Sequence, residues 1–382
     1  MFSLKGLCAA AGCLAVAGAA LAQNPVPAPQ APSPAPLLRH TFEESEHGWT
    51  TMGGGAVRIA HEPADVHGGN AALQYDYTVT KGEASALLVS MPEGVPAGTK
   101  SVGLWLKCDV AAPLALMLQE RDGARYVAGF TVPKGQWQEV RLGLGDFALS
   151  DMKDDPPDAN GRLDIDQVVG LGLVDLGQWL VQADNADLLR MLHVVAGPRR
   201  LDVDDFELTS APLPPAFRVS GAELRVEGFS RPQVSWMVLG DARAAAISGA
   251  PLTGRGVRLT YSQAPGNVAA MFRMIPQRLL AGVESIAFTA ACTKPTRLLV
   301  QLEERGGGKY NALVEVPGGS AAQKVSVRLA DMAPDNESKD NNGRLDPDQV
   351  KSIAIIDPTG IVGGGDGENS LWVGPPATQA GS

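Results

Sequence analysis

The sequence predicts an all-β protein made of two tandem antiparallel β-sandwich (jelly-roll) domains. In several segments apolar residues recur with a period of two, which is typical of strands that bury one face. Gly, Pro and Asp turns separate these short segments, and few stretches have a helical pattern. Blocks of the first half also return in the second half in the same order. A repeat this long indicates two copies of a whole domain, because solenoid and propeller units repeat every ~20–50 residues.

The repeat is visible in three separate blocks at a nearly constant offset. The matching pairs are 118–126 with 302–310, 160–164 with 342–346, and Ser101 and Cys108 with Ser285 and Cys292, at offsets of 184, 182 and 184 residues. We expect any feature that both copies need to occur twice. The copies, called module 1 and module 2, are predicted to span 37–209 and 217–376, joined by a proline-containing linker at 210–216 and followed by a polar tail at 377–382.

The first residues are typical of a secretory signal peptide, predicted to span 1–22. Lys5 supplies the positive start, an apolar run follows, and the sequence A-L-A at 20–22 matches a small-residue cleavage site. The apolar run is too short for a permanent membrane anchor, although a lipid anchor at Cys13 is an alternative. Residues 23–36 form a proline-rich linker that favours an extended tether. We therefore expect a periplasmic or secreted protein with no transmembrane segment.

Strands are predicted in the same order along each copy. The alternating apolar positions are 102, 104, 106 and 108, then 114, 116 and 118, in module 1, and 286, 288, 290 and 292, then 298, 300 and 302, in module 2. A further strand is predicted from Tyr126, which alternates in phase with Phe130 and Val132. Its phase favours a core position for Tyr126. The segment 183–192 is compatible with a short helix in module 1.

The positions of the cysteines and the net charge indicate which covalent links and which partners can be excluded. Removal of the signal peptide leaves Cys108 and Cys292, which occupy the same position in the two repeats. A bridge between equivalent strands of separate domains is geometrically unfavourable, so we predict two buried free thiols. The formal net charge of −10 disfavours nucleic acid and anionic membranes as partners, because both need clustered Lys and Arg.

The repeated N-G-R-L-D motif at 160–164 and 342–346 superficially suggests an EF-hand loop. With the glycine at loop position 6, position 12 is Gln167 or Gln349, where a bidentate Glu is needed. We therefore predict a structural turn followed by a capped helical turn. The spacing of Asp164 and Gln167 fits a capping box.

Module 1 also carries five blocks that together resemble a known family. They are F-E…G-W at 42–49, H-G-G-N-A-A-L at 67–73, V-G-L-W-L-K at 102–107, K-G-Q-W-Q-E-V at 134–140 and L-D-V-D-D-F-E-L at 201–208. In this order they resemble the galactose-binding-like sandwiches of non-catalytic carbohydrate-binding modules, of family 11 in particular, and the related domain of complex I intermediate-associated protein 30. Module 2 is a degenerate copy, in which Thr289 replaces Trp105 and the closing strand lacks the acidic pair.

The resemblance implies a structural Ca²⁺ in module 1. In such modules an acidic side chain near the first strand, one near the last strand and carbonyl groups of the glycine-rich loop hold the ion. The matching metal ligands here are Glu43 and Asp205, with backbone oxygens of 67–70. Oxygen ligands of this kind suit a hard cation. The alternative is that both carboxylates are solvated charges at strand ends.

Trp105 is the leading candidate for contact with a ligand, because it lies on the face opposite the aliphatic positions of its strand. A flat exposed indole can stack on the apolar face of a sugar, while polar neighbours orient the hydroxyls. Lys107 lies on the same face, and Gln119 and Arg121 are expected on the corresponding side of the next strand. Tyr126 completes the predicted ligand-binding set.

The sequence offers little for catalysis. It has no G-x-S-x-G elbow and no H-E-x-x-H spacing, and all its histidines lie in module 1. We predict an exported, non-catalytic protein that binds a polysaccharide, a neutral glycan, through the exposed face of module 1. A periplasmic scaffold or assembly factor that binds a protein partner is the alternative. On the face that carries Trp105, a flat exposed aromatic ring with polar neighbours would favour the glycan, and an apolar patch shared with module 2 would favour the protein partner.

Overall fold

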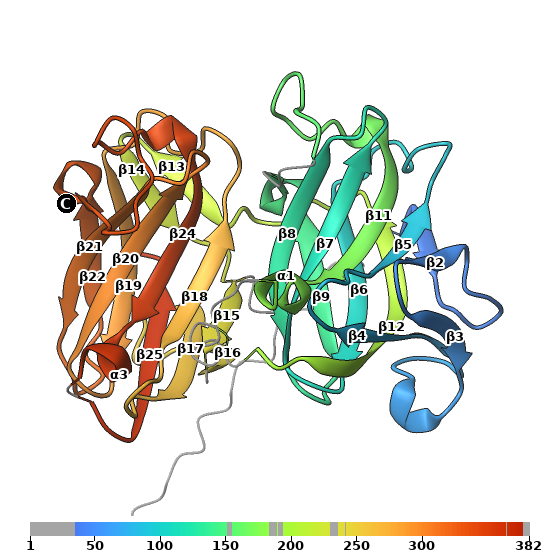
Figure 1. Ribbon diagram of the computed structural model, residues 1–382, viewed down its shortest axis with the longest axis horizontal. Coiled ribbons are helices and arrows are strands. Elements are labelled where there is room, and N and C mark those ends of the chain that lie inside the picture. The colour runs from blue at the N-terminus through green and yellow to red at the C-terminus, as the bar shows by residue number, and fades with distance from the viewer. Residues whose placement is uncertain are drawn as a thin grey trace, which may run out of the picture. The chain divides into compact units, whose positions relative to one another are not determined.

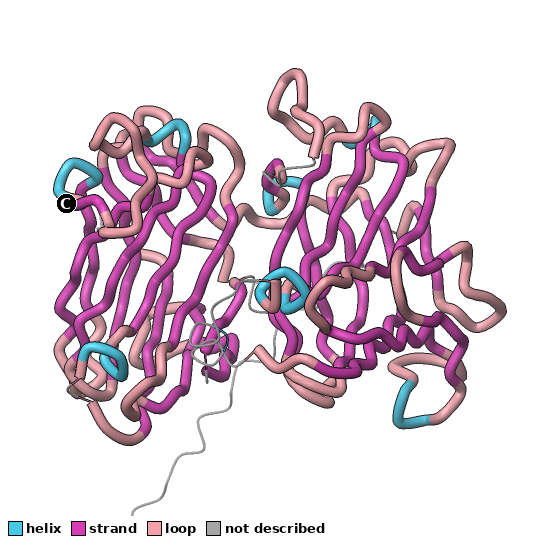
Figure 2. Tube along the Cα trace, viewed as in Figure 1, coloured by secondary structure: helices cyan, strands magenta, loops and turns pink. Residues whose placement is uncertain are grey.

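The computed structural model consists mainly of β-strands joined by short loops (Figure 2). It describes residues 35–150, 155–182, 189, 194–229, 236–240, 242–363 and 365–376. The predicted signal peptide, most of the first linker and the tail therefore lie outside the described residues. So does all of the predicted helix at 183–192 except Leu189. Two short helices are described, α1 (Gly177–Leu180) and α3 (Thr359–Val362).

Module 1 is a sandwich of two six-stranded sheets (Figure 1). Sheet A has the order β3-β4-β12-β6-β9, with β1 paired to β12, and sheet B has the order β10-β8-β7-β11-β5-β2. The strands of sheet A are β1 (Leu38–His40), β3 (Ala56–Ala60), β4 (Ala72–Val79), β6 (Ser101–Cys108), β9 (Gln138–Gly143) and β12 (Gly197–Thr209). Those of sheet B are β2 (Trp49–Met52), β5 (Ala86–Ser90), β7 (Ala112–Glu120), β8 (Arg125–Val132), β10 (Ala148–Leu149) and β11 (Val168–Asp175).

Module 2 repeats this plan with sheets of seven and six strands. Sheet C has the order β13-β14-β19-β25-β17-β16, with β22 paired to β19, and sheet D has the order β15-β18-β24-β20-β21-β23. The strands of sheet C are β13 (Phe217–Ser220), β14 (Glu223–Val226), β16 (Ala242–Ser248), β17 (Arg255–Ser262), β19 (Ser285–Cys292), β22 (Gln323–Arg328) and β25 (Glu368–Gly374). Those of sheet D are β15 (Met237–Gly240), β18 (Ala269–Met274), β20 (Thr296–Glu304), β21 (Lys309–Val316), β23 (Ala333–Pro334) and β24 (Val350–Asp357).

The strand order establishes the duplication in three dimensions. The run β3-β4-β12-β6-β9 of sheet A corresponds to β16-β17-β25-β19-β22 in sheet C. The order β10-β8-β7-β11-β5-β2 of sheet B corresponds to β23-β21-β20-β24-β18-β15 in sheet D. Every pair of described strands is antiparallel except β14 with β19. The predicted all-β class and the tandem antiparallel sandwiches are therefore confirmed.

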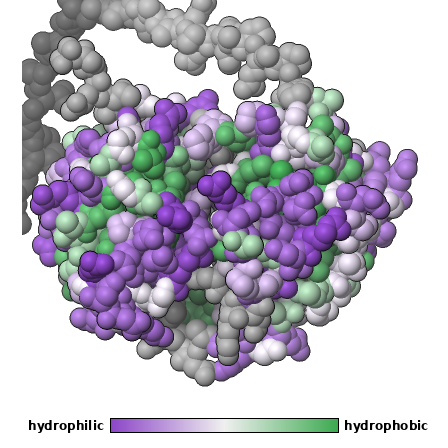
Figure 3. Space-filling model, turned by 90° about the horizontal axis from the view of Figure 1, so that it is seen from above, coloured by the Kyte–Doolittle hydropathy of each residue, from purple (hydrophilic) through white to green (hydrophobic). Residues whose placement is uncertain are grey.

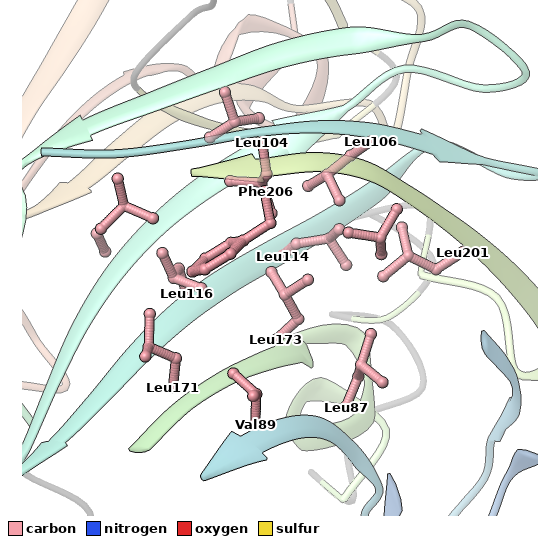
Figure 4. Close-up of a cluster of buried hydrophobic side chains, with 14 of the residues drawn as sticks. Leu87, Val89, Leu104, Leu106, Leu114, Leu116, Leu171, Leu173, Leu201 and Phe206 are labelled. Atoms are coloured by element: carbon pink, nitrogen blue, oxygen red, sulfur yellow. The ribbon is translucent and has the colours of Figure 1, made fainter. Parts of the chain in front are cut away.

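Each module has its own hydrophobic core between its two sheets. Figure 4 shows the core of module 1, where Leu104 and Leu106 of β6 meet Leu114 and Leu116 of β7 around Phe206. All five side chains are at most 1% exposed. These are the positions that the period of two marks as buried, because successive side chains of a strand point to opposite faces.

Buried polar pairs recur at equivalent positions in the two cores. The Tyr77 hydroxyl donates to Asp175 at 2.9 Å in module 1, and the Tyr261 hydroxyl donates to Asp357 at 2.7 Å in module 2. These pairs satisfy polar groups that burial would otherwise leave unbonded. Cys108 and Cys292 are buried free thiols, as predicted, and burial raises the pKa of each to about 12.

The repeated N-G-R-L-D motif forms the same hydrogen-bonded loop in both modules. In module 1 hydrogen bonds join Tyr126 to Asp158, Asn160 to Asp164, and the Asp164 amide to Glu120. The corresponding hydrogen bonds in module 2 join Tyr310 to Asp340, Asn342 to Asp346, and the Asp346 amide to Glu304. This confirms a structural role. A 3-10 turn follows in each copy, Ile165–Gln167 and Pro347–Gln349, so the predicted helical turn is also confirmed. The capping box is wrong, because the Asp164 side chain binds the Asn160 amide and does not cap the turn.

The two modules contact each other within one compact unit, Pro34–Ser382. Met237 of β15 packs over Gly129 of β8, where a Cβ atom would lie 2.5 Å from the Met237 sulfur. The Val238 amide donates to the Thr131 hydroxyl at 2.8 Å. Arg273 and Asp146 form a buried ion pair across the contact. The outer face of sheet B therefore packs against module 2.

The surface in the view of Figure 3 is mainly hydrophilic, with smaller hydrophobic patches. Among the described residues, no helix has the length and apolar character needed to cross a membrane.

Candidate functional site

The outer face of sheet A carries an unusually dense set of polar side chains, which we call the polar face. Residues of β3, β4, β6 and β12 alternate between the core and this face. The polar face consists of Arg58, Gln74, Asp76, Thr78, Trp105, Lys107, Arg200 and Asp202, joined by Asp65 and His67 from the loop that precedes β4. Direct cross-strand pairs fix the neighbours, since Lys107 lies opposite Asp202 and Asp76 lies opposite Arg200.

Trp105 lies at one end of the polar face within an aromatic cluster. The His67 ring stacks on its indole, with ring centroids 3.6 Å apart and an interplanar angle of 15°. Trp137 meets His67 edge to face at 5.7 Å, and the Lys107 ammonium lies 5.6 Å from the Trp137 centroid. Trp105 is therefore half-buried, and His67 covers one face of its ring. His67 and Trp137 belong to the blocks at 67–73 and 134–140 that resemble the family. Those blocks did not indicate that the two side chains would contact Trp105.

Lys107 is the centre of an ionic network next to this cluster. Its ammonium lies 2.7 Å from Asp65 and 3.1 Å from Asp202, and it donates to the Ala64 carbonyl at 2.6 Å. Burial lowers the pKa of Lys107, but the hydrogen bonds to Asp65 and Asp202 outweigh it and raise the pKa overall. The hydrogen bond from Lys107 lowers the pKa of Asp65. The lysine is therefore held in its charged form.

The network continues along β4 and β12. Gln74 donates to Asp202 at 2.8 Å and accepts a bond from Arg58. Arg200 lies 3.3 Å from Asp76 and 3.7 Å from Asp65, which closes the network into a ring. Each of its cations is paired with a carboxylate, so the polar face has little net charge of its own.

An open cleft of 740 Å³ lies at the other end of the polar face. Its polar lining comes from Asp76 and Arg200 of the network, with Thr78, Glu83 and Asp109 beside them. Gly54 and Gly55 form part of its wall. The cleft therefore offers carboxylates, a guanidinium and a hydroxyl at the surface, which are donors and acceptors suited to a ligand with many hydroxyl groups.

The structure separates the other predicted ligand-binding residues from Trp105. Gln119 is in β7 and Arg121 follows it, and β7 belongs to sheet B. Their expected position beside Trp105 is therefore wrong, because consecutive strands β6 and β7 lie in different sheets and their outward side chains point away from each other. Tyr126 is only 2% exposed and bonds to Asp158, which confirms the predicted core position. Its place in the predicted ligand-binding set is therefore wrong, because a buried side chain cannot contact a ligand on the surface.

The loop at 66–70 is fastened to β12 and to the segment after β1 by carboxylates. Asp204 is fully buried and accepts hydrogen bonds from the His67 and Gly68 amides at 3.0 Å and from the Asp205 amide at 2.8 Å. Glu43 accepts the Asn70 amide at 2.9 Å. Gly69 has a φ of +71°, a left-handed conformation that favours glycine, and a Cβ atom there would displace the Glu43 carboxylate from the loop.

The predicted metal ligands Glu43 and Asp205 both lie against this loop, but each already has partners. Glu43 binds backbone amides, and Asp205 lies 2.7 Å from the Arg39 guanidinium. Among the described residues, His67, Asp204 and Asp205 form one of two groups whose ligand atoms approach within 4.8 Å, and Glu120, Asp122 and Asp158 form the other. Arg39 contacts Oδ1 of Asp205, and Oδ2 lies 3.6 Å from the His67 ring, so the Ca²⁺ site stays a prediction.

Comparison with known proteins finds fold similarity alone. No protein-family profile matches the chain, and no curated protein matches it in sequence. In three dimensions it is similar to the family 11 carbohydrate-binding module from Clostridium thermocellum in complex with a β-1,3-1,4-mixed-linked tetrasaccharide (16% identity, TM-score 0.35, 46% of this chain and 95% of that chain). It is also similar to the tandem family 22 modules of Xyn10C from Paenibacillus barcinonensis (13% identity, TM-score 0.29, 91% and 98%). The sandwich architecture rests on the strand pairing described above.

Proposed function

We propose that the protein is exported and non-catalytic, and that it binds a neutral glycan on the polar face of module 1. One observation carries the proposal: a single sheet face joins a half-buried aromatic cluster at Trp105 to an open cleft of 740 Å³ lined by polar side chains. Aromatic rings contact the apolar faces of sugars, and fixed polar groups orient hydroxyls. The signal peptide predicted at 1–22 supports export.

The charge pattern of the polar face favours a neutral ligand. Arg58, Lys107 and Arg200 all lie within 4.0 Å of carboxylates of the same network. An anionic ligand would have to compete with these carboxylates for the cations. A ligand whose hydroxyl groups both donate and accept can add to the network without breaking an ion pair.

Ca²⁺ bound by Glu43 and Asp205 belongs to the same proposal. Those carboxylates would hold the ion against the loop at 66–70, and thereby fix His67 over Trp105. Oxygen donors of this kind suit Ca²⁺. A rise in melting temperature with added Ca²⁺, lost in Asp205→Ala, would support the site. An unchanged melting temperature in millimolar Ca²⁺ would contradict it.

A glycan array probed with the mature protein, with and without Ca²⁺, tests the main proposal. We expect binding to neutral oligosaccharides that falls about tenfold or more in Trp105→Ala. Arg200→Ala tests the cleft end of the same face. Arg121→Ala is the matched control, because it removes an arginine that follows a strand of sheet B.

The outcomes separate three readings of the molecule. Loss in Trp105→Ala and Arg200→Ala with Arg121→Ala unaffected supports the polar face. Loss of glycan binding in Arg121→Ala alone would indicate that the binding site lies on sheet B. Absence of binding by a folded protein to every neutral glycan tested overturns the proposal, and the scaffold alternative then leads to a search for protein partners.

A further inference from the structure

Module 2 has its own version of the polar face, on the outer side of sheet C. Leu201 lies opposite Cys108 in module 1, and Leu371 lies opposite Cys292 in module 2, so Asp202 and Trp372 occupy equivalent positions. Where module 1 has the carboxylate that pairs with Lys107, module 2 therefore has an indole. Module 2 lacks the acidic pair and the counterpart of Trp105, but it has this indole in their place.

Trp372 lies on the outer side of sheet C, on β25 between β17 and β19. Its neighbours on β25, Leu371 and Val373, belong to the core, so the indole points to the opposite side. Directly across from it are Arg258 of β17 and Ala291 of β19. Ala291 is fully buried although it faces outward, which fits an indole lying over a small neighbour. Unlike Trp105, Trp372 stacks on no aromatic ring among the described residues.

Two exposed arginines lie on the same face as this indole, one beside it and one on the next strand. Arg258 is the direct cross-strand neighbour of Trp372, and Arg243 of β16 is a diagonal neighbour of Arg258. At such spacings side chains ~5–8 Å apart at Cβ can contact one ligand. Within the described part of the chain, neither guanidinium forms an ion pair or hydrogen bond. Glu368 is on the same side of β25 as Trp372 and forms an ion pair with neither arginine. The two guanidiniums therefore outnumber the carboxylate on this face of a protein of net charge −10.

We propose that Trp372, Arg258 and Arg243 bind an acidic polysaccharide, with a pyranose ring on the indole and its carboxylate or sulfate group on the guanidiniums. Guanidinium groups bind planar oxyanions through two parallel hydrogen bonds. Ser370 and Thr260 lie opposite each other on the same face and supply hydroxyl groups for the sugar. The site lies in the other module and has the opposite charge preference from the polar face, so it does not depend on the function proposed above.

Titration of the full mature chain with three polymers tests this inference. The probes are polygalacturonate for carboxylate, dextran sulfate for sulfate, and neutral dextran as the uncharged comparison, each at low and physiological salt. We expect binding to one or both acidic polymers and none to neutral dextran. Which acidic polymer binds identifies the anion. Arg258→Glu should weaken that binding about tenfold or more, because it replaces an attraction by a repulsion.

Matched variants distinguish a built site from general attraction of a polyanion. Arg278→Glu makes the same charge change at an exposed residue of the loop between β18 and β19, outside the strands of sheet C, and should leave binding nearly unchanged. Trp372→Ala should weaken binding at any salt, whereas a purely electrostatic surface would not respond to it. Equal losses in Arg258→Glu and Arg278→Glu, or no binding to either acidic polymer, would overturn the proposal. Trp105→Ala should have no effect here, which separates this test from that of module 1.

Discussion

His40 is a histidine that the fold keeps neutral. Its ring is 8% exposed, and its Nδ1 accepts a hydrogen bond from the Trp49 indole at 3.1 Å. The His47 ring stacks on it with centroids 4.7 Å apart. Burial, together with the nearby His47, lowers the pKa of His40 to about 4. A protonated ring could not accept the Trp49 bond, so protonation works against the native state.

We predict that this residue makes module 1 sensitive to acid. The unfolded chain takes up the proton near pH 6.5 and the folded chain near pH 4, so stability is complete above pH 6.5 and falls as the pH decreases through this window. The loss should reach on the order of 2 kcal/mol at pH 4. Urea unfolding between pH 7.5 and pH 4 measures it. His40→Gln should flatten the profile, and an equally steep profile in that variant would contradict the prediction.

Glu120 and Glu304 have the opposite pH dependence. Both are buried acceptors of a backbone amide in the repeated loop. Burial raises the pKa of Glu120 to about 7, and it raises the pKa of Glu304 as well. The folded chain therefore holds a proton that the unfolded chain has lost above about pH 4.5. Stability from this source declines as the pH rises from about 4.5 through about 7.

We predict that Glu120→Gln stabilises module 1 at pH 8 by on the order of 2 kcal/mol. The glutamine oxygen can still accept the Asp164 amide, while the buried charge is gone. Denaturant unfolding at pH 8 and pH 5 should show a gain at pH 8 alone, and Glu304→Gln should repeat the trend in module 2. A loss of stability at pH 8 would instead mean that the ionised carboxylate is needed.

At the scale of elements, β12 departs from the regular alternation of a strand. Its register with β6 shifts between Asp204 and Glu207, and Asp205 has a φ of +48°. The bulge lets Asp204 bind the loop at 66–70 while Phe206 returns to the core. Bulges of this kind re-aim side chains near functional sites. A pattern of period two cannot reveal which member of the Asp204–Asp205 pair turns inward.

We predict that Asp204→Ala releases the loop at 66–70. Three backbone amides would lose their acceptor, which costs about 2–4 kcal/mol. His67 would no longer be held over Trp105, so the indole should become more accessible. Thermal melts and acrylamide quenching of tryptophan fluorescence measure the two effects. Asp76→Ala on the same face is the control, because that carboxylate is partly exposed and binds no loop amide.

Strands and core positions could be predicted from the sequence because each depends on local alternation. The positions 102–108 and 114–118 are strands with the expected buried side. The assignment of β6 and β7 to different sheets could not be predicted, since it depends on where the chain crosses the sandwich. For the same reason Trp105 was correctly placed on an outer face, but Gln119 and Arg121 were wrongly placed beside it. Arg243 and Arg258, distant in sequence, become neighbours through strand register alone.

At the scale of the whole molecule, a buried ion pair links the two modules. Arg273 and Asp146 are each at most 5% exposed, and the Arg273 guanidinium also lies 5.5 Å from the Phe217 ring. We predict that Arg273→Met lowers the stability of the intact chain by about 3–5 kcal/mol, because Asp146 loses this buried partner. It should also turn one calorimetric transition into two. Arg297→Met, which removes an exposed pair within module 2, is the control and should have little effect. A single, unshifted transition in Arg273→Met would contradict the prediction.

The correspondence of β6 with β19, and of their neighbours, has a consequence for how the chain reaches its native state. Two sandwiches with the same strand order in one polypeptide can exchange equivalent strands while they fold, and such misassembly is a characteristic failure of repeated domains. The two copies share apolar positions, so the core alone discriminates poorly between correct and swapped partners. The outward residues differ instead: Lys107 meets Asp202 in one copy, where the other has Ala291 opposite Trp372. A strand placed in the wrong copy would leave an ion unpaired, so we expect the divergence of the two surfaces to disfavour such exchange.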